Sequence, residues 1–226
     1  MFSFSKNFAV ENVMYSDFIT NQVGEEGYST ALSGGTIDTS VAGDATHPGV
    51  VTCAYVSAAT DRSLIRFAVS CHNIGGGDHF MEFITGIVTL SNVTDEYVFF
   101  CGWYDGTSAD AVDGVYFEYD RATNGDFWAV STSNNSSRTK TALANAVQAA
   151  TYVRLGIEIN AAGTRVKFFL NGALVATHTT NIPTGTARVT TPCWGFRKTA
   201  GTGAANVAGL DRWTLRHSLT TPSWTA

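Results

Sequence analysis

Apolar and polar residues alternate over long parts of the chain, most clearly between residues 152 and 180. One side of the first alternating run is entirely apolar: Val153, Leu155, Ile157 and Ile159. A period of two is typical of a half-buried β-strand, so Ile157 is expected in the core and its neighbour Glu158 at the surface. Turn residues follow at 160–163, and Asn171-Gly172 is a strong hairpin signal. The pattern predicts three consecutive antiparallel strands.

Further runs rich in aromatic and β-branched residues extend this pattern. They lie at 49–56, 63–70, 79–90, 97–103, 114–119, 127–132, 193–198 and 210–215, with Gly, Asp, Asn and Ser between them. About ten to twelve strands without intervening helices predict an all-β, two-sheet antiparallel jelly-roll sandwich. The Ala-rich run 142–150 is interpreted as a loop or one turn, and 131–141 and 199–209 as flexible loops.

Composition narrows the function classes. The chain has 226 residues, of which 44% are hydrophobic and 15% charged, and a balance of 22 Gly to 4 Pro suits one β-sandwich domain. A net charge of −5 without any run of like charges disfavours nucleic acid as a partner. The first residues lack the pattern of a signal peptide and no run is long enough to span a membrane, which predicts synthesis in the cytoplasm and no membrane partner.

The four cysteines, Cys53, Cys71, Cys101 and Cys193, are widely spaced. This spacing favours reduced, mostly buried thiols over a disulfide framework. Cys71 and His72 lie near His79 in the sequence, with a glycine-rich segment between, but a structural zinc site needs four ligands at closer, paired spacing. A glycine loop that joins two strands is therefore preferred, and neither a metal nor a cofactor is predicted.

Two candidate sugar sites follow from the residue types. Glu118 and Asp120 alternate on one strand and could present the two carboxylates of a glycosidase, but a solvated face near a turn is the preferred interpretation. An exposed aromatic row could stack on sugar rings, although most aromatic residues in a sandwich are core. The possible glycan-facing rings are Trp103, Tyr104, Tyr116 and Trp128.

Four segments, 113–119, 128–132, 153–160 and 166–172, together resemble the concanavalin A-like, laminin-G-like jelly roll, especially its copies in structural proteins of tailed bacteriophages. The likeness covers about residues 15–217. Glucanases with this fold carry a further acid two or three residues after the carboxylate pair, where this chain has Ala122 and Thr123. The resemblance therefore implies binding or assembly, and no enzyme activity is expected.

Within that family the chain is expected to be a virion protein. Residues 1–14 are interpreted as an apolar arm and 15–226 as the jelly roll, with no segment left for a fibre shaft. This favours a capsid decoration or cement protein on the major capsid shell, with Phe2, Phe4 and Phe8 as the contact residues. Capsid or other virion proteins and further copies of the chain are the expected partners. The alternative is a carbohydrate-binding, lectin-like adhesin module of a tail fibre or a free glycan-binding domain.

Overall fold

The predicted hairpins between residues 152 and 180 are present in the computed structural model. Strands β11 (Thr151–Ile159), β12 (Val166–Leu170) and β13 (Ala173–His178) follow one another and pair antiparallel. Asn171 and Gly172 form the tight turn with φ angles of 52° and 84°, a conformation that Asn and Gly adopt more readily than other residues. Ile157 is fully buried and Glu158 is exposed, which confirms the predicted faces.

The structure describes residues 11–16, 28–42, 49–55, 61–67, 72–106, 110–201 and 206–220. One sheet has the order β13-β12-β11-β6-β15-β4-β3, and β1 also pairs with β15. Its other strands are β1 (Glu11–Ser16), β3 (Gly35–Ala42), β4 (Gly49–Tyr55), β6 (Gly77–Ile87) and β15 (Asn206–Leu219). We call this sheet A.

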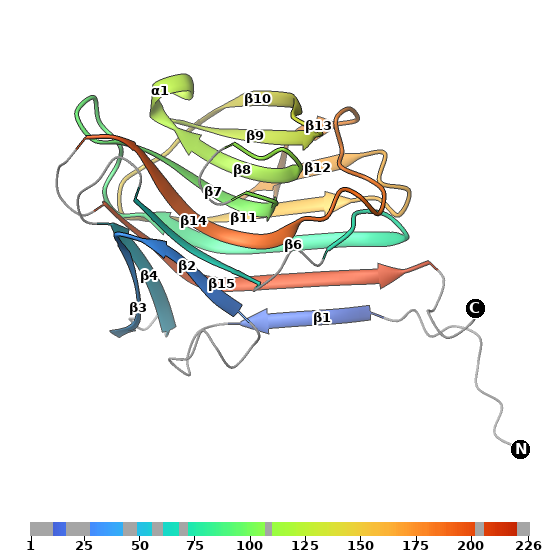
Figure 1. The fold of residues 1–226 in the computed structure, drawn as a ribbon, viewed down its shortest axis with the longest axis horizontal. Helices are drawn as coiled ribbons and strands as arrows, with labels where there is room; N and C mark the ends of the chain where they lie inside the picture. Colours follow the sequence, from blue (N-terminus) through green and yellow to red (C-terminus); the bar gives the residue numbers. More distant parts are fainter. Residues whose placement is uncertain are drawn as a thin grey trace, which may run out of the picture.

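The second sheet, sheet B, has the order β10-β9-β8-β7-β14-β5-β2 (Figure 1). Its strands are β2 (Tyr28–Ser33), β5 (Arg62–Phe67), β7 (Glu96–Tyr104), β8 (Gly114–Asp120), β9 (Phe127–Asn134), β10 (Ser137–Ala146) and β14 (Thr191–Ala200). All strand pairs in both sheets are antiparallel, so the predicted two-sheet jelly-roll sandwich is confirmed.

The main core lies between the two sheets. Buried side chains of both sheets contribute to it, such as Phe83 and Trp213 of sheet A and Trp194 of sheet B. The half-buried Phe67 of sheet B packs against Trp213. The Trp194 indole N–H donates to the Thr85 hydroxyl at 2.8 Å, and the Thr85 hydroxyl donates to the Gly209 carbonyl. These two hydrogen bonds pair the Trp194 and Thr85 side chains across the sandwich, as a low-polarity interior favours.

Three local predictions, for 131–141, 142–150 and 199–209, were wrong in whole or in part. Residues 131–141, expected to be a flexible loop, form most of the β9–β10 hairpin, with positive φ angles at Asn135 and Ser136. The Ala-rich run continues β10 as far as Ala146 because pairing with β9 outweighs the local preference of alanine. The short helix α1 (Arg121–Asn124) was not predicted. Strands β14 and β15 also extend well into the expected loop 199–209.

The N-terminal arm is only partly within the described residues. Residues 11–14 of the predicted arm belong to β1, which pairs with the C-terminal half of β15. Phe2, Phe4 and Phe8 lie outside the described residues, so their predicted contact role stays a prediction, as does the division of the chain at residue 14.

Three cysteines, Cys53, Cys101 and Cys193, are buried free thiols, and burial raises the pKa of each. Cys71 lies outside the described residues. In the part of the chain that the structure describes, no helix has the length and apolar character needed to cross a membrane.

Candidate functional site

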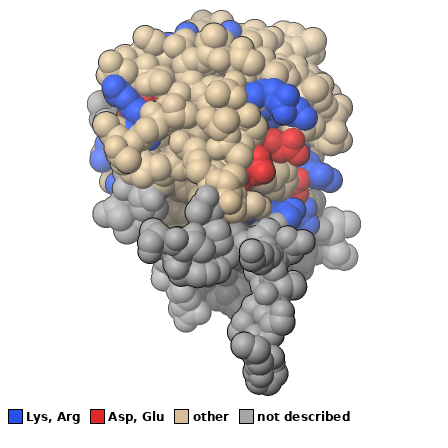
Figure 2. All heavy atoms as spheres, turned by 90° about the vertical axis from the view of Figure 1, so that its right-hand side faces the viewer, with Lys and Arg blue, Asp and Glu red and all other residues tan. Residues whose placement is uncertain are grey.

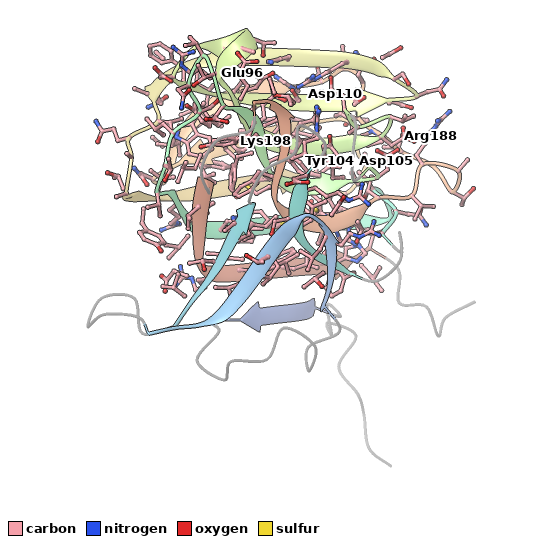
Figure 3. The ribbon with its side chains drawn as sticks, turned by 60° about the vertical axis from the view of Figure 1, so that its left-hand side comes forward. Glu96, Tyr104, Asp105, Asp110, Arg188 and Lys198 are labelled. Carbon is pink, nitrogen blue, oxygen red and sulfur yellow. The ribbon has the colours of Figure 1, made fainter. Side chains whose placement is uncertain are left out.

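The four predicted glycan-facing rings do not form an exposed platform. Trp103, Tyr104, Tyr116 and Trp128 are each at most 2% exposed. The two tryptophans belong to the main core, whereas the two tyrosines belong to a second buried cluster that also contains Ala111. Tyr104 ends β7, next to Asp105 and below Asp110 (Figure 3). Strand alternation sent these rings to both faces of sheet B, and packing covered them.

The Glu118 carboxylate is also unavailable as one half of a catalytic pair with Asp120. Glu118 is 3% exposed and forms ion pairs with Arg138 and with Lys140 of β10. The expected solvated face is therefore wrong for Glu118. Asp120 caps the short helix α1, because its carboxylate accepts a hydrogen bond from the Ala122 amide at 3.1 Å. Both carboxylates have structural partners.

Three histidines meet at one end of the core, between the two sheets. His72 and His79, considered as metal ligands from the sequence, are joined by a 2.8 Å hydrogen bond, and the rings of His79 and His217 stack at 4.1 Å. His72 also stacks on Trp103. Burial, helped by the neighbouring imidazoles, lowers the pKa of His72 to about 3 and that of His79 to about 4. Burial also lowers the pKa of His217.

This histidine cluster does not have the geometry of a metal site. Ligand nitrogens must converge on one ion at about 2.0–2.1 Å, whereas the stacked rings of His79 and His217 are inclined by only 15°. Their nitrogen lone pairs therefore lie in two nearly parallel, stacked planes. Among the described residues, no group of three or more His, Cys, Asp or Glu side chains could hold a metal ion. The cluster fills the end of the core with neutral polar rings.

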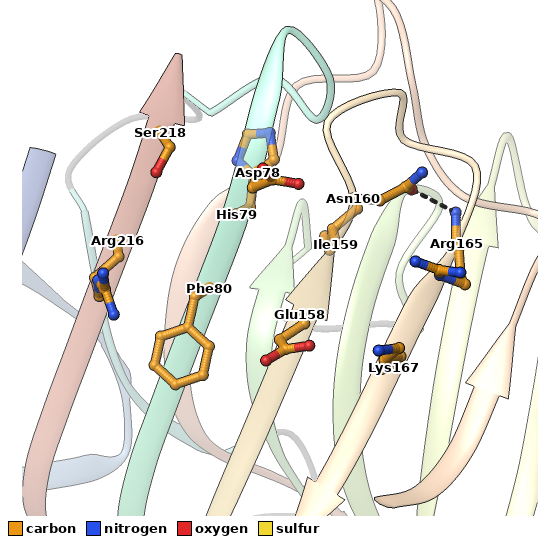
Figure 4. Close-up of a pocket in the computed structure, with 10 residues that line it drawn as sticks. All are labelled: Asp78, His79, Phe80, Glu158, Ile159, Asn160, Arg165, Lys167, Arg216 and Ser218. Atoms are coloured by element: carbon orange, nitrogen blue, oxygen red, sulfur yellow. Dashed lines mark hydrogen bonds between the residues drawn. The ribbon is translucent and has the colours of Figure 1, made fainter. Parts of the chain in front are cut away.

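A hollow of about 370 Å³ lies on the outer face of sheet A, which we call the outer hollow. Its lining comes from four adjacent strands, β15, β6, β11 and β12, and from the turn between the last two (Figure 4). The half-buried ring of Phe80 forms part of its floor. Phe80 pairs in register with Arg216 on one side and with Glu158 on the other, and Glu158 pairs with Lys167.

Charged side chains of both signs surround this ring. Asp78 and Glu158 contribute carboxylates, and Arg165, Lys167 and Arg216 contribute cations. On the side of the molecule that lies at the right in Figure 1, basic and acidic side chains lie next to one another at the surface (Figure 2). Asp78, Glu158 and Lys167 form no ion pair or side-chain hydrogen bond with the residues that the structure describes. No described residue therefore occupies their polar atoms, and these could bind the polar groups of a ligand.

The sequence analysis missed Phe80 and Asp78 as site residues. Alternation does place them opposite the core residues His79 and Met81, so their outward direction was predictable. That Phe80 would have Arg216 as a neighbour was not predictable, because the two residues are far apart in the sequence and meet only through the pairing of β6 with β15.

Comparison with solved structures identifies proteins of the same fold. A protein of unknown function, SO2946 from Shewanella oneidensis MR-1, superposes with a TM-score of 0.71 at 12% identity and covers 94% of this chain and 89% of its own. Peanut lectin superposes with a TM-score of 0.62 at 13% identity, covering 94% and 99%. The carbohydrate esterase vb_24B_21 of the Shiga toxin-encoding bacteriophage phi24B gives 0.58 at 11% identity, covering 87% and 93%.

These likenesses confirm the concanavalin A-like fold and correct one expectation. Proteins of this fold include the phage esterase and alginate lyases such as AlgAT5, which has a TM-score of 0.54 at 17% identity and covers 75% of this chain and 79% of its own. The expectation of a non-enzymatic protein is contradicted, because this fold also carries enzymes. The finer expectation, a structural protein of tailed phages, stays a prediction.

Sequence comparison gives the family. No curated protein sequence matches the chain. The model of the SO2946-like C-terminal domain matches residues 46–211, well over half of the chain. The SO2946 structure superposes over nearly the whole chain. This protein therefore belongs to the SO2946-like C-terminal domain family.

Proposed function

We propose that the protein binds carbohydrate and that the glycan lies in the outer hollow. The observation that carries this proposal is the Phe80 ring beside Asp78, Glu158 and Lys167, three charged side chains that form no ion pair with the described residues. A sugar ring has an apolar C–H face that an aromatic ring can cover, and hydroxyl groups around its edge. Asp78 and Glu158 would accept hydrogen bonds from these hydroxyls, and Lys167 would donate to them.

The size and charge of the outer hollow fit this class of ligand. Its volume of about 370 Å³ lies within the range of about 300–1,000 Å³ that small-molecule sites occupy. Cations and carboxylates are interspersed in it. This mixture suits a polyhydroxylated ring, whereas a nucleic acid needs a surface of mainly positive charge. The likeness to peanut lectin supports the proposal at the level of the fold.

Replacing Phe80 with alanine is expected to weaken glycan binding about tenfold, because loss of one stacking ring costs about 0.5–1.5 kcal/mol and loss of its apolar contact area adds to this. A glycan array would identify the ligand, and isothermal titration calorimetry would measure its Kd for both proteins. Phe127→Ala is the matched control, since Phe127 is 42% exposed on β9 in sheet B, away from the hollow. Equal losses for the two variants, or an array with no bound glycan, would reject the proposal.

We further propose a location for this binding activity, the surface of a phage virion, where the chain would act as a decoration protein or as an adhesin module. The likeness to a phage esterase and the resemblance to phage structural proteins support this location. The partners would be capsid or other virion proteins, with Phe2, Phe4 and Phe8 as contacts.

A truncation tests the arm. Deleting residues 2–10 leaves β1 intact, so the domain should still fold, but the truncated protein should no longer sediment with purified particles. The full chain serves as the control in the same gradient. Sedimentation of both proteins at equal occupancy would show that the contact lies on the sandwich, and sedimentation of neither would reject the virion location.

A further inference from the structure

A second hollow continues the outer hollow along β11. It measures about 180 Å³ and shares Phe80 and Glu158 with the first. Its own lining includes Gly156, Phe169 of β12 and Glu82 of β6. The centres of the two linings lie roughly three residues apart on β11, or about 10 Å at 3.3 Å per residue. Together the two hollows form one groove across the outer face of sheet A.

Gly156 opens this second hollow, although the fold does not need a glycine there. Gly156 lies mid-strand between two buried neighbours, and a Cβ atom on it would come no closer than 3.5 Å to any other atom, the Phe169 Cβ. In contrast, a Cβ on Gly102 or Gly195 would come within 2.3 Å of a backbone oxygen, so those two glycines are required by packing. A glycine inside a strand costs roughly 0.5–1 kcal/mol relative to alanine. Glycines inside strands often lie where a ligand or another backbone approaches closely.

The two halves of the groove differ in chemistry. In the second hollow Glu82 is held by two ion pairs, with Arg154 at 2.6 Å and Arg212 at 3.0 Å. Its carboxylate is therefore committed to the protein. The half-buried Phe169 pairs in register with Gly156 and forms one wall. The first hollow thus offers free hydrogen-bonding groups, whereas the second offers a flat backbone floor beside an aromatic ring.

We propose that the ligand is an oligosaccharide of at least two units and that its second unit lies over Gly156 against Phe169. This inference rests on the proposed function, because it extends the same site. The first unit is held by hydrogen bonds around Phe80, and the second by contact with the floor and the ring. A monosaccharide occupies the first hollow alone, so only longer glycans gain from the second.

Gly156→Val is the test, because the valine side chain would occupy the space above the backbone of residue 156 in the second hollow. Valine is also a residue that strands favour. Affinity would be measured by calorimetry for mono-, di-, tri- and tetrasaccharides of glucose, galactose, mannose and mannuronate. The variant is expected to lose more than tenfold in affinity for the best tri- or tetrasaccharide and to bind its monosaccharide as the wild type does. Ala142→Val on the exposed face of β10 is the matched control. Thermal unfolding should give a Tm at or above that of the wild type, which separates blocked binding from misfolding.

The outcomes distinguish the two proposals. If the wild-type protein binds none of these sugars and no array glycan, the proposed function fails. If it binds the monosaccharide as tightly as the tetrasaccharide, or if Gly156→Val leaves the tetrasaccharide affinity unchanged, the second subsite is rejected and the proposed function stands. If Gly156→Val lowers both affinities by the same factor, the second subsite is likewise rejected.

Discussion

Replacing Ile157 with aspartate is expected to lower the free energy of unfolding by roughly 4–7 kcal/mol. Ile157 is fully buried in the core on β11, where it pairs with Met81 and Phe168. The change removes a large apolar side chain and leaves a carboxyl group without a partner, which must be neutralised or stay unsatisfied. Because domains are stable by only about 5–15 kcal/mol, the variant should lose most of its stability.

Urea unfolding followed by tryptophan fluorescence measures this loss, since several tryptophans are buried in the core. Glu158→Ala on the exposed side of the same strand is the control and should stay within about 0.5 kcal/mol of the wild type. Similar midpoints for the two variants would contradict the placement of Ile157 in the core.

Acidification from pH 6.5 to pH 5 is expected to cost about 2–4 kcal/mol of stability, at about 1.4 kcal/mol per pH unit for each histidine that must stay neutral. The folded pKa values of His72 and His79, about 3 and about 4, lie below the ordinary value of 6.5. The unfolded chain therefore binds protons that the folded chain does not. Their contribution is fully present above pH 6.5 and is lost as the pH falls towards these folded values.

The groups around the cluster determine the size of this effect. His217 stacks on His79 and disfavours a second charge, whereas the Asp78 carboxylate partly offsets the cost by favouring protonation of His79. Trp103 packs on His72 and offers no charge. His178, hydrogen-bonded to Thr132 and Thr141, also has a lowered pKa through burial and adds to the slope.

Urea midpoints at pH 7.5, 6.5, 5.5 and 5.0 would give the slope for the wild type and for His72→Gln. The variant carries one fewer histidine that must stay neutral, so its stability should fall less steeply by about one proton per molecule below pH 6.5. Parallel slopes for the two proteins would show that the cluster does not control acid stability.

Local regularities made the fold predictable. The alternation around Ile157, followed by Asn171-Gly172, specifies a hairpin within fewer than thirty residues. The same logic failed for β10, whose Ala and Thr residues have no clear alternation and become a strand only because β9 offers them a partner. Strand pairing is a tertiary interaction that local preference does not record.

The candidate site depended on the tertiary structure much more than the fold did. Burial of Trp103 and Tyr116 follows from packing on the two faces of sheet B, so their ring chemistry alone suggested a platform that does not exist. The burial of the Glu118 carboxylate likewise depends on its ion pair with Arg138, which belongs to the β9–β10 hairpin.

The all-β class, the hairpins and the faces of strands such as β6 and β11 follow from local sequence patterns, because a period of two needs only neighbouring residues. These local patterns do not show which outward-facing side chains become neighbours. Phe80, Glu158 and Arg216 surround one hollow because β15, β6 and β11 lie side by side in sheet A. Those strands are brought together by burial of a common core from distant parts of the chain, and that order is visible only in the folded protein.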